Sequence, residues 1–148
     1  MRVLGVDPGS VRIGLALSDE DGLIASPHST LKGGDVERGA RALVEQVKQL
    51  GAERVVVGLP LRLDGTEGDA ARRARRLAER VAELGGVEVE LWDERLSSRA
   101  AERALSSAGV RGRARKQHVD RVAAALILQS YLDAKRTRDT DGTDTFED

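Results

Sequence analysis

An acidic residue, Asp7, directly follows the apolar run Val3–Val6 and is itself followed by Pro8 and Gly9. An unpaired carboxylate is costly to bury, so a metal ion, a hydrogen-bond network or solvent must satisfy its charge. Glycine allows the sharp turn that returns the chain towards Ile13. The pattern suits a site that binds a metal ion or a phosphate, but an Asp-Pro-Gly hairpin turn accounts for it equally well.

Two further acidic positions could complete a site with Asp7. Asp93 and Glu94 directly follow the alternating run Val87–Trp92. Both are therefore expected at the carboxyl edge of a sheet, where open α/β sheets bind their ligands. Side-chain alternation is unreliable at a strand end, so the pattern favours Glu94 over Asp93 only slightly. Asp120 is expected in the first turn of a helix, where it is either a ligand or an acid that interacts favourably with the helix dipole.

The helical spacing places Asp120 on one face with Ala124, Ile127 and Tyr131, which is the inward edge of an amphipathic helix. Carboxylates from two strands and a helix would form an oxygen-only site that suits Mg²⁺ or Mn²⁺. One or two such ions can activate water and clamp a phosphodiester. The chain contains no cysteine, which excludes a disulfide framework, a thiol nucleophile and a cysteine-based zinc site.

The elements that must position these acids follow from apolar periodicity and from glycine-containing turns. The expected strands are Val3–Val6, Ile13–Ser18, Leu23–Leu31, Val55–Leu59 and Val87–Trp92. The expected helices are one capped by Asp35 and stopped by Gly51, and others over Glu67–Leu84, Ser97–Ala108 and Gln117–Arg136. The fold class is α/β: three antiparallel strands and then two parallel ones form a five-stranded mixed sheet in a three-layer sandwich, with helices on both sides.

Composition points to one domain over residues 1–136 and an acidic, disordered tail over residues 137–148. The whole chain of 148 residues has 24 basic and 25 acidic side chains. The tail holds five of the acids and one basic residue, Arg138, so the body has 23 basic and 20 acidic residues and a net charge of +3. This charge is compatible with a polyanionic partner. Trp, Tyr and Phe occur once each, so a nucleic acid would be recognised mainly through its phosphates and shape.

No segment resembles a charged leader followed by an apolar stretch, and no run reaches membrane-spanning length. We therefore expect a soluble, cytoplasmic protein without a membrane partner.

Four segments, in order, span nearly the whole expected body: Gly5–Asp19 (GVDPGSVRIGLALSD), Val56–Gly65 (VVGLPLRLDG), Asp93–Ser98 (DERLSS) and Lys116–Leu132 (KQHVDRVAAALILQSYL). Together they resemble the YqgF family, also called RuvX, of the RNase H-like superfamily, which is related to the RuvC-type junction resolvases. The resemblance implies a metal-dependent endonuclease with Asp7, Glu94 and Asp120 as its catalytic, metal-binding acids. Its implied substrate is either the precursor of 16S ribosomal RNA, in ribosome biogenesis, or a four-way DNA junction. Cutting a junction twice would require a homodimer.

The chain also departs from the wider superfamily. RuvC-like enzymes carry an acid on the strand that corresponds to Val55–Leu59 and a second acid on the last helix, where this chain has Ala123. The site therefore has fewer carboxylates than those enzymes. His118 is either an additional ligand or, more in keeping with its place ahead of a helix, a cap or surface residue.

Several basic and hydroxyl side chains could bind phosphates. The candidates for nucleic-acid binding are Arg12, Arg95, Ser97, Arg113, Arg115 and Lys116. A second group of arginines lies on the expected helix Glu67–Leu84, and for it a solvated outer face is the favoured interpretation.

Two other functions remain open at this point. Actin-like ATPases and sugar kinases also begin with a strand and an Asp-Gly turn that contacts phosphate, but they need two lobes and usually a longer chain. A nucleic-acid-binding domain without catalytic activity would also account for the smaller number of acids.

Overall fold

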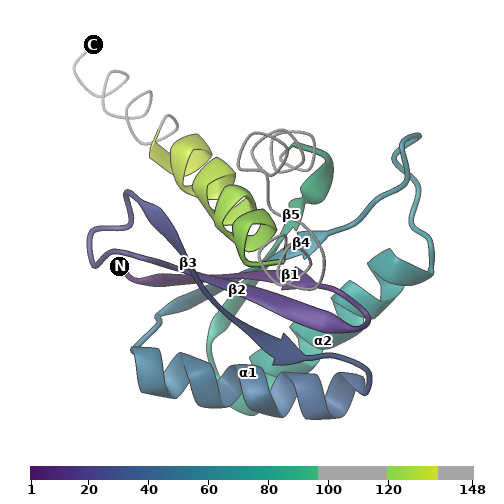
Figure 1. Cartoon of the computed structure of the whole chain (residues 1–148), viewed down its shortest axis with the longest axis horizontal. Coiled ribbons are helices and arrows are strands. Elements are labelled where there is room, and N and C mark those ends of the chain that lie inside the picture. Colours follow the sequence, from purple (N-terminus) through teal and green to yellow (C-terminus); the bar gives the residue numbers. More distant parts are fainter. Residues whose placement is uncertain (97–119, 137–148) are drawn as a thin grey trace, which may run out of the picture.

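The computed structural model describes residues 1–96 and 120–136. Its strands form one mixed sheet in the order β3-β2-β1-β4-β5 (Figure 1). The strands are β1 (Val3–Pro8), β2 (Arg12–Ser18), β3 (Ala25–Lys32), β4 (Arg54–Leu59) and β5 (Glu88–Asp93). β1, β2 and β3 are antiparallel neighbours, whereas β4 pairs in parallel with β1 and β5 in parallel with β4. The predicted sheet is confirmed, with strand ends shifted by one or two residues.

Helices cover both faces of this sheet, as predicted. α1 (Val36–Leu50) and α2 (Asp69–Gly85) lie on one face, and a helix over residues 120–136 lies on the other (Figure 1). Each face has its own apolar core, one centred on Leu4, Leu15 and Leu43 and the other on Ile127 and Leu128. The expected helix Ser97–Ala108, the first residues of the expected helix Gln117–Arg136 and the expected tail lie outside the described residues. Among the helices of the described part of the chain, none combines the length and the apolar character needed to cross a bilayer.

Local sequence accounts for the boundaries of these elements. Asp35 caps α1 by accepting a hydrogen bond of 3.0 Å from the backbone N–H of Glu37, and Gly51 ends the helix in the left-handed conformation. The continuous apolar run in β4 is buried on both faces because this strand lies inside the sheet. β5 alternates because it is an edge strand.

Two glycines let helix 120–136 lie very close to the sheet. A Cβ atom on Gly5 would lie 2.7 Å from the Cβ of Leu128, and one on Gly14 would lie 2.0 Å from the carbonyl oxygen of Asp120. Neither position can hold a larger residue unless the helix moves. At the edge of the sheet, the Trp92 indole N–H donates a hydrogen bond of 3.0 Å to Ser130 Oγ. These contacts fix the helix, and with it Asp120, against β1 and β2.

Candidate active site

β1 carries Asp7 to the edge of the sheet at which the three parallel strands end. Asp7 is the next-to-last residue of β1 and pairs with Gly14 of β2. Burial raises the pKa of the Asp7 carboxyl to about 9, and the nearby acids Glu94 and Asp120 contribute to the rise. A hydrogen bond between the Asp7 and Glu94 carboxyls acts in the same direction. Asp7 therefore keeps its proton at neutral pH when no cation is present.

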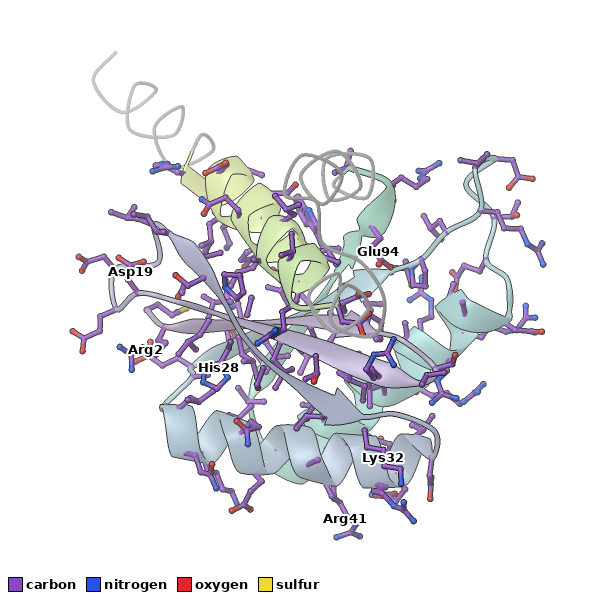
Figure 2. All side chains as sticks on the ribbon, viewed as in Figure 1. Arg2, Asp19, His28, Lys32, Arg41 and Glu94 are labelled. Atoms are coloured by element: carbon purple, nitrogen blue, oxygen red, sulfur yellow. The ribbon has the colours of Figure 1, made fainter. Side chains whose placement is uncertain are left out.

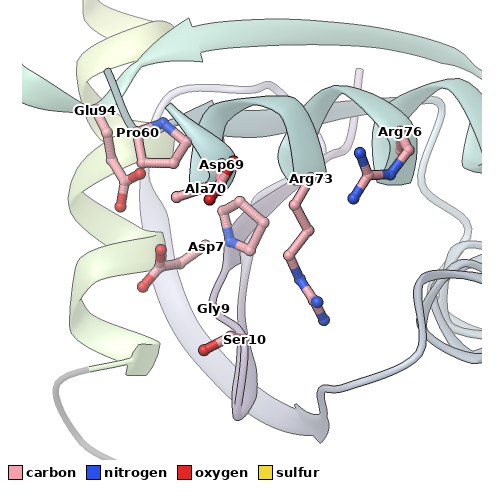
Figure 3. Close-up of a pocket in the computed structure, with 10 residues that line it drawn as sticks. Asp7, Gly9, Ser10, Pro60, Asp69, Ala70, Arg73, Arg76 and Glu94 are labelled. Carbon is pink, nitrogen blue, oxygen red and sulfur yellow. The ribbon is translucent and has the colours of Figure 1, made fainter. Parts of the chain in front are cut away.

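Glu94 reaches the same place from β5. It is the first residue of the short 3₁₀ helix η1 (Glu94–Leu96), which begins where β5 ends. Its Cγ and Cδ atoms lie 3.4 Å from the position that a Cβ on Gly58 of β4 would occupy. The absence of a side chain at Gly58 thus leaves room for Glu94 to cross the end of β4. Figure 3 shows the Asp7 and Glu94 carboxyls close together at one end of the cavity.

The choice between Asp93 and Glu94, which the sequence pattern hardly decides, is clear in the structure. Asp93 accepts hydrogen bonds from the Arg95 guanidinium, at 3.0 Å from Nε and 2.6 Å from Nη2. This contact lowers the pKa of Asp93, in contrast to the raised pKa of Asp7. Asp93 therefore holds Arg95, and Glu94 is the acid beside Asp7. Figure 2 shows Glu94 at the end of the sheet opposite to Arg2 and Asp19.

Asp120 approaches the pair from the other layer. Its Oδ2 accepts a hydrogen bond of 2.6 Å from Arg12 Nε of β2, in an ion pair whose side chains are 19% and 29% exposed. Asp120 is close enough to Asp7 to help raise the pKa of that carboxyl. Within residues 1–96 and 120–136, no three His, Cys, Asp or Glu side chains form a group that could hold a metal ion. The structure thus joins Asp7 to Glu94 and places Asp120 nearby, held by Arg12.

The two hydrogen-bonded acids face a cavity of about 480 Å³. Figure 3 shows that its opposite wall is the first part of α2, which contributes Arg73 and Arg76. Among residues 1–96 and 120–136, the cavity is lined by Asp7, Pro8, Gly9, Ser10, Pro60, Asp69, Ala70, Arg73, Arg76 and Glu94. The sequence favours a solvated face for all the arginines of this helix and does not distinguish Arg73 and Arg76 from the others. The signal that could have found them is their three-residue spacing on a helix that begins beside the carboxyl edge of the sheet.

Of the residues predicted to bind nucleic acid, the structure describes only Arg12 and Arg95, and each is paired with an acid. Arg12 pairs with Asp120, and Arg95 pairs with Asp93 while its Nη1 donates a 3.4 Å hydrogen bond to the carbonyl of Leu63. The remaining nucleic-acid candidates lie outside the described residues: Ser97, Arg113, Arg115 and Lys116. His118, the candidate for an additional metal ligand, lies there too.

A family model described as "RuvX: Holliday junction resolvase" matches residues 1–134. A curated protein of Syntrophus aciditrophicus (strain SB), named "Putative pre-16S rRNA nuclease", is 46% identical over 134 residues, which is 90% of this chain and 89% of that protein. A protein of the same name from Bacillus cytotoxicus is 47% identical over 137 residues, covering 91% of this chain and 100% of its own length.

Solved structures share the architecture. RuvC of T. thermophilus, solved in complex with a Holliday junction substrate, superposes with a TM-score of 0.58 at 22% identity and covers 93% of this chain and 96% of its own. The Fowlpox virus resolvase, solved with Holliday junction DNA, gives a TM-score of 0.55 at 11% identity and covers 90% of this chain and 98% of its own. These likenesses confirm the predicted RNase H-like fold.

Proposed function

This chain belongs to the RuvX family, and we propose that it hydrolyses phosphodiester bonds of structured nucleic acid at the site formed by Asp7, Glu94 and Asp120. The observation that carries the proposal is the hydrogen-bonded pair of Asp7 and Glu94, which faces a cavity at the carboxyl ends of three parallel strands. Two carboxyls in direct contact repel each other once both are ionised. A fold retains such an arrangement where a cation or a reacting group compensates it.

We propose the precursor of 16S ribosomal RNA as the substrate. The support is the name carried by relatives that are 46% and 47% identical and aligned over most of their length. A four-way DNA junction is the second candidate, supported by the description of the matching family model. Paired incisions in a junction would require a homodimer, whereas trimming of RNA can use one copy.

The carboxylate chemistry of the three acids suits Mg²⁺ or Mn²⁺, but Asp7, Glu94 and Asp120 would have to draw closer together to hold one ion. All three acids offer carboxylate oxygens, which hard divalent cations prefer, and two of them are already in contact. Asp7, Glu94 and Asp120 would hold the ion. When bound, the ion supplies a Lewis acid that polarises the phosphodiester and promotes the ionisation of water.

The side chains prepare the site in two ways. The raised pKa of Asp7 keeps a proton on its carboxyl beside Glu94, and binding of a cation would displace that proton. Arg12 holds the carboxylate of Asp120 beside the pair, because it is fixed on β2, next to the strand that carries Asp7. Asp7 and Glu94 are therefore already together before the substrate arrives, with Asp120 held near them by Arg12.

A cleavage assay tests the proposal. The wild-type protein is incubated with precursor 16S ribosomal RNA, a four-way DNA junction and single strands, in Mg²⁺ or Mn²⁺. Asp7→Asn removes one acid of the pair, whereas the control Asp21→Asn removes an acid that lines a different pocket, with Met1 and Val3 at the start of β1. We expect the wild type and the control to cut the RNA, leaving a 5′-phosphate and a 3′-hydroxyl, and Asp7→Asn to be at least about 100-fold slower.

Other results of the cleavage assay would change the proposed site, substrate or function. Equal cleavage by the wild type and Asp7→Asn would refute the assignment of the reaction to this site. If the protein cuts the four-way DNA junction and not the RNA, the junction would replace precursor 16S ribosomal RNA as the proposed substrate. Binding without cleavage under both metals would make the protein a nucleic-acid-binding module, and ATP turnover would revive the kinase-like alternative.

A further inference from the structure

The arginines of α2 divide into two groups that the sequence does not distinguish. Three of them are neutralised by carboxylates. The pairs are Arg72 with Asp69 at 2.5 Å, Arg75 with Glu67 at 2.6 Å, and Arg80 with Glu37 at 2.9 Å. These three arginines form the solvated, charge-balanced part of the helix surface, as the sequence analysis favoured for the whole group.

Arg73 and Arg76 differ in their surroundings. Both line the cavity that contains Asp7 and Glu94. Within residues 1–96 and 120–136, neither forms an ion pair with a carboxylate. Arg73 donates a hydrogen bond to the neutral carbonyl of Gly34, which positions the guanidinium without cancelling its charge. Within the described residues, the α2 wall of the cavity therefore carries two positive charges without an ion-pair partner, although Arg76 is near enough to Asp69 to help lower the pKa of that carboxyl.

The two arginines do not act as partners of the catalytic acids. Within the described residues, no ion pair joins Arg73 or Arg76 to Asp7. Figure 3 shows Arg73 extending from α2 into the cavity, while the carboxyls of Asp7 and Glu94 lie at its other end. The cavity is thus acidic at one end and basic at the other.

We propose that Arg73 and Arg76 form a second phosphate-binding subsite, which holds a backbone phosphate next to the one that is cut. The inference rests on the proposed nuclease function, since it assigns the acidic end to the scissile phosphate. The two arginines are three residues apart and hence about 4.5 Å apart along the helix axis, so both can reach one short stretch of backbone. Asp69, the acid at the α2 wall, is already paired with Arg72 and opposes the bound phosphate less. The subsite would fix the position of the strand relative to Asp7 and Glu94.

Binding without a divalent metal tests the subsite separately from the reaction. The probe is a fluorescein-labelled RNA hairpin with a single-stranded tail, measured by anisotropy in EDTA over a series of salt concentrations. Arg76→Gln has a matched control in Arg75→Gln, because the two residues are neighbours, both are exposed and both substitutions remove one charge. We expect Arg76→Gln to weaken binding about 3-fold and Arg73→Gln/Arg76→Gln about 10-fold, with the salt slope reduced by about 0.7 per lost contact to a single strand. Arg75→Gln should stay within about 2-fold of the wild type.

A second variant separates charge from structure. Arg73→Lys loses the geometry of the hydrogen bond to Gly34 but keeps the charge, so it should retain most of the affinity if the charge is what matters. Equal losses in Arg75→Gln and Arg76→Gln, or an unchanged salt slope in the double variant, would overturn the subsite. A wild type that binds this RNA but cuts no substrate would overturn the nuclease function and not the subsite. If the wild type cuts its substrate but the double variant binds the RNA as tightly as the wild type, the subsite would be overturned and the nuclease function would stand.

Discussion

Replacing Asp7 by Asn should stabilise the metal-free protein, and the gain should grow with pH. The raised pKa means that the folded protein keeps a proton on Asp7 up to about pH 9, whereas the unfolded chain loses it near the ordinary value of 3.8. This group therefore supports folding fully below pH 3.8, and its contribution is lost as the pH rises towards 9. Asn is neutral at every pH and has nearly the same shape, and its amide can donate a hydrogen bond to Glu94.

The size of the gain follows from the width of that pH window. Each pH unit between the unfolded and folded pKa values costs about 1.36 kcal/mol for one proton. From pH 3.8 to pH 7 the cost reaches about 4 kcal/mol as a ceiling. We expect Asp7→Asn to raise the free energy of unfolding by between about 1 and 4 kcal/mol at pH 7. For a domain of this size, each kcal/mol should raise the Tm by roughly 2–4 °C.

Urea and thermal unfolding in EDTA measure the effect. The wild type, Asp7→Asn and the control Asp21→Asn are compared from about pH 5 to about pH 8, within the window in which the stability of the wild type should fall. Addition of Mg²⁺ or Mn²⁺ should then raise the Tm of the wild type and change that of Asp7→Asn much less, because the variant lacks one carboxylate of the pair. A stability difference between Asp7→Asn and the wild type that is the same at every pH would refute the reasoning.

Further substitutions at three contacts test the placement of the final helix and of Asp120. Gly14→Ala should destabilise by about 1–3 kcal/mol or more in urea unfolding, because its Cβ would lie 2.0 Å from the carbonyl oxygen of Asp120. Arg12→Gln should lower the free energy of unfolding by about 1–3 kcal/mol. In a double-mutant cycle with Asp120→Asn, most of this loss should appear as coupling energy between Arg12 and Asp120. Trp92→Phe and Ser130→Ala should each cost about 1 kcal/mol without adding in the double variant, since both remove one hydrogen bond.

The sequence predicts the framework of the site because that framework depends on strand direction. β1, β4 and β5 are parallel, so the acids that follow β1 and β5 must meet at one edge of the sheet. The inward face of helix 120–136 is equally predictable, since Ala124, Ile127 and Tyr131 recur at helical spacing and are all buried. Apolar periodicity and connection rules carry this information without knowledge of any contact.

What the sequence could not decide depends on partners that are distant along the chain or on a single turn. The roles of Asp93 and Glu94 are set by η1, which turns one acid to Arg95 and the other to Asp7. The arginines of α2 are separated by their partners, and Glu37, which pairs with Arg80, lies 43 positions earlier. Spacing on one helix gives the face of each arginine but not the acid that neutralises it.

β4 has little room for an acidic side chain at Gly58. Gly58 stands near the end of this strand, where a Cβ would lie 2.8 Å from Ile127 Cδ1 and 3.4 Å from the side chain of Glu94. A carboxylate there would have to displace either the helix that carries Asp120 or the acid that already contacts Asp7. The absence of a side chain at Gly58 and the close approach of Glu94 are therefore two aspects of one packing arrangement. A site built this way places Asp7 and Glu94 together at one end of the cavity, and it leaves the opposite wall to Arg73 and Arg76 of α2.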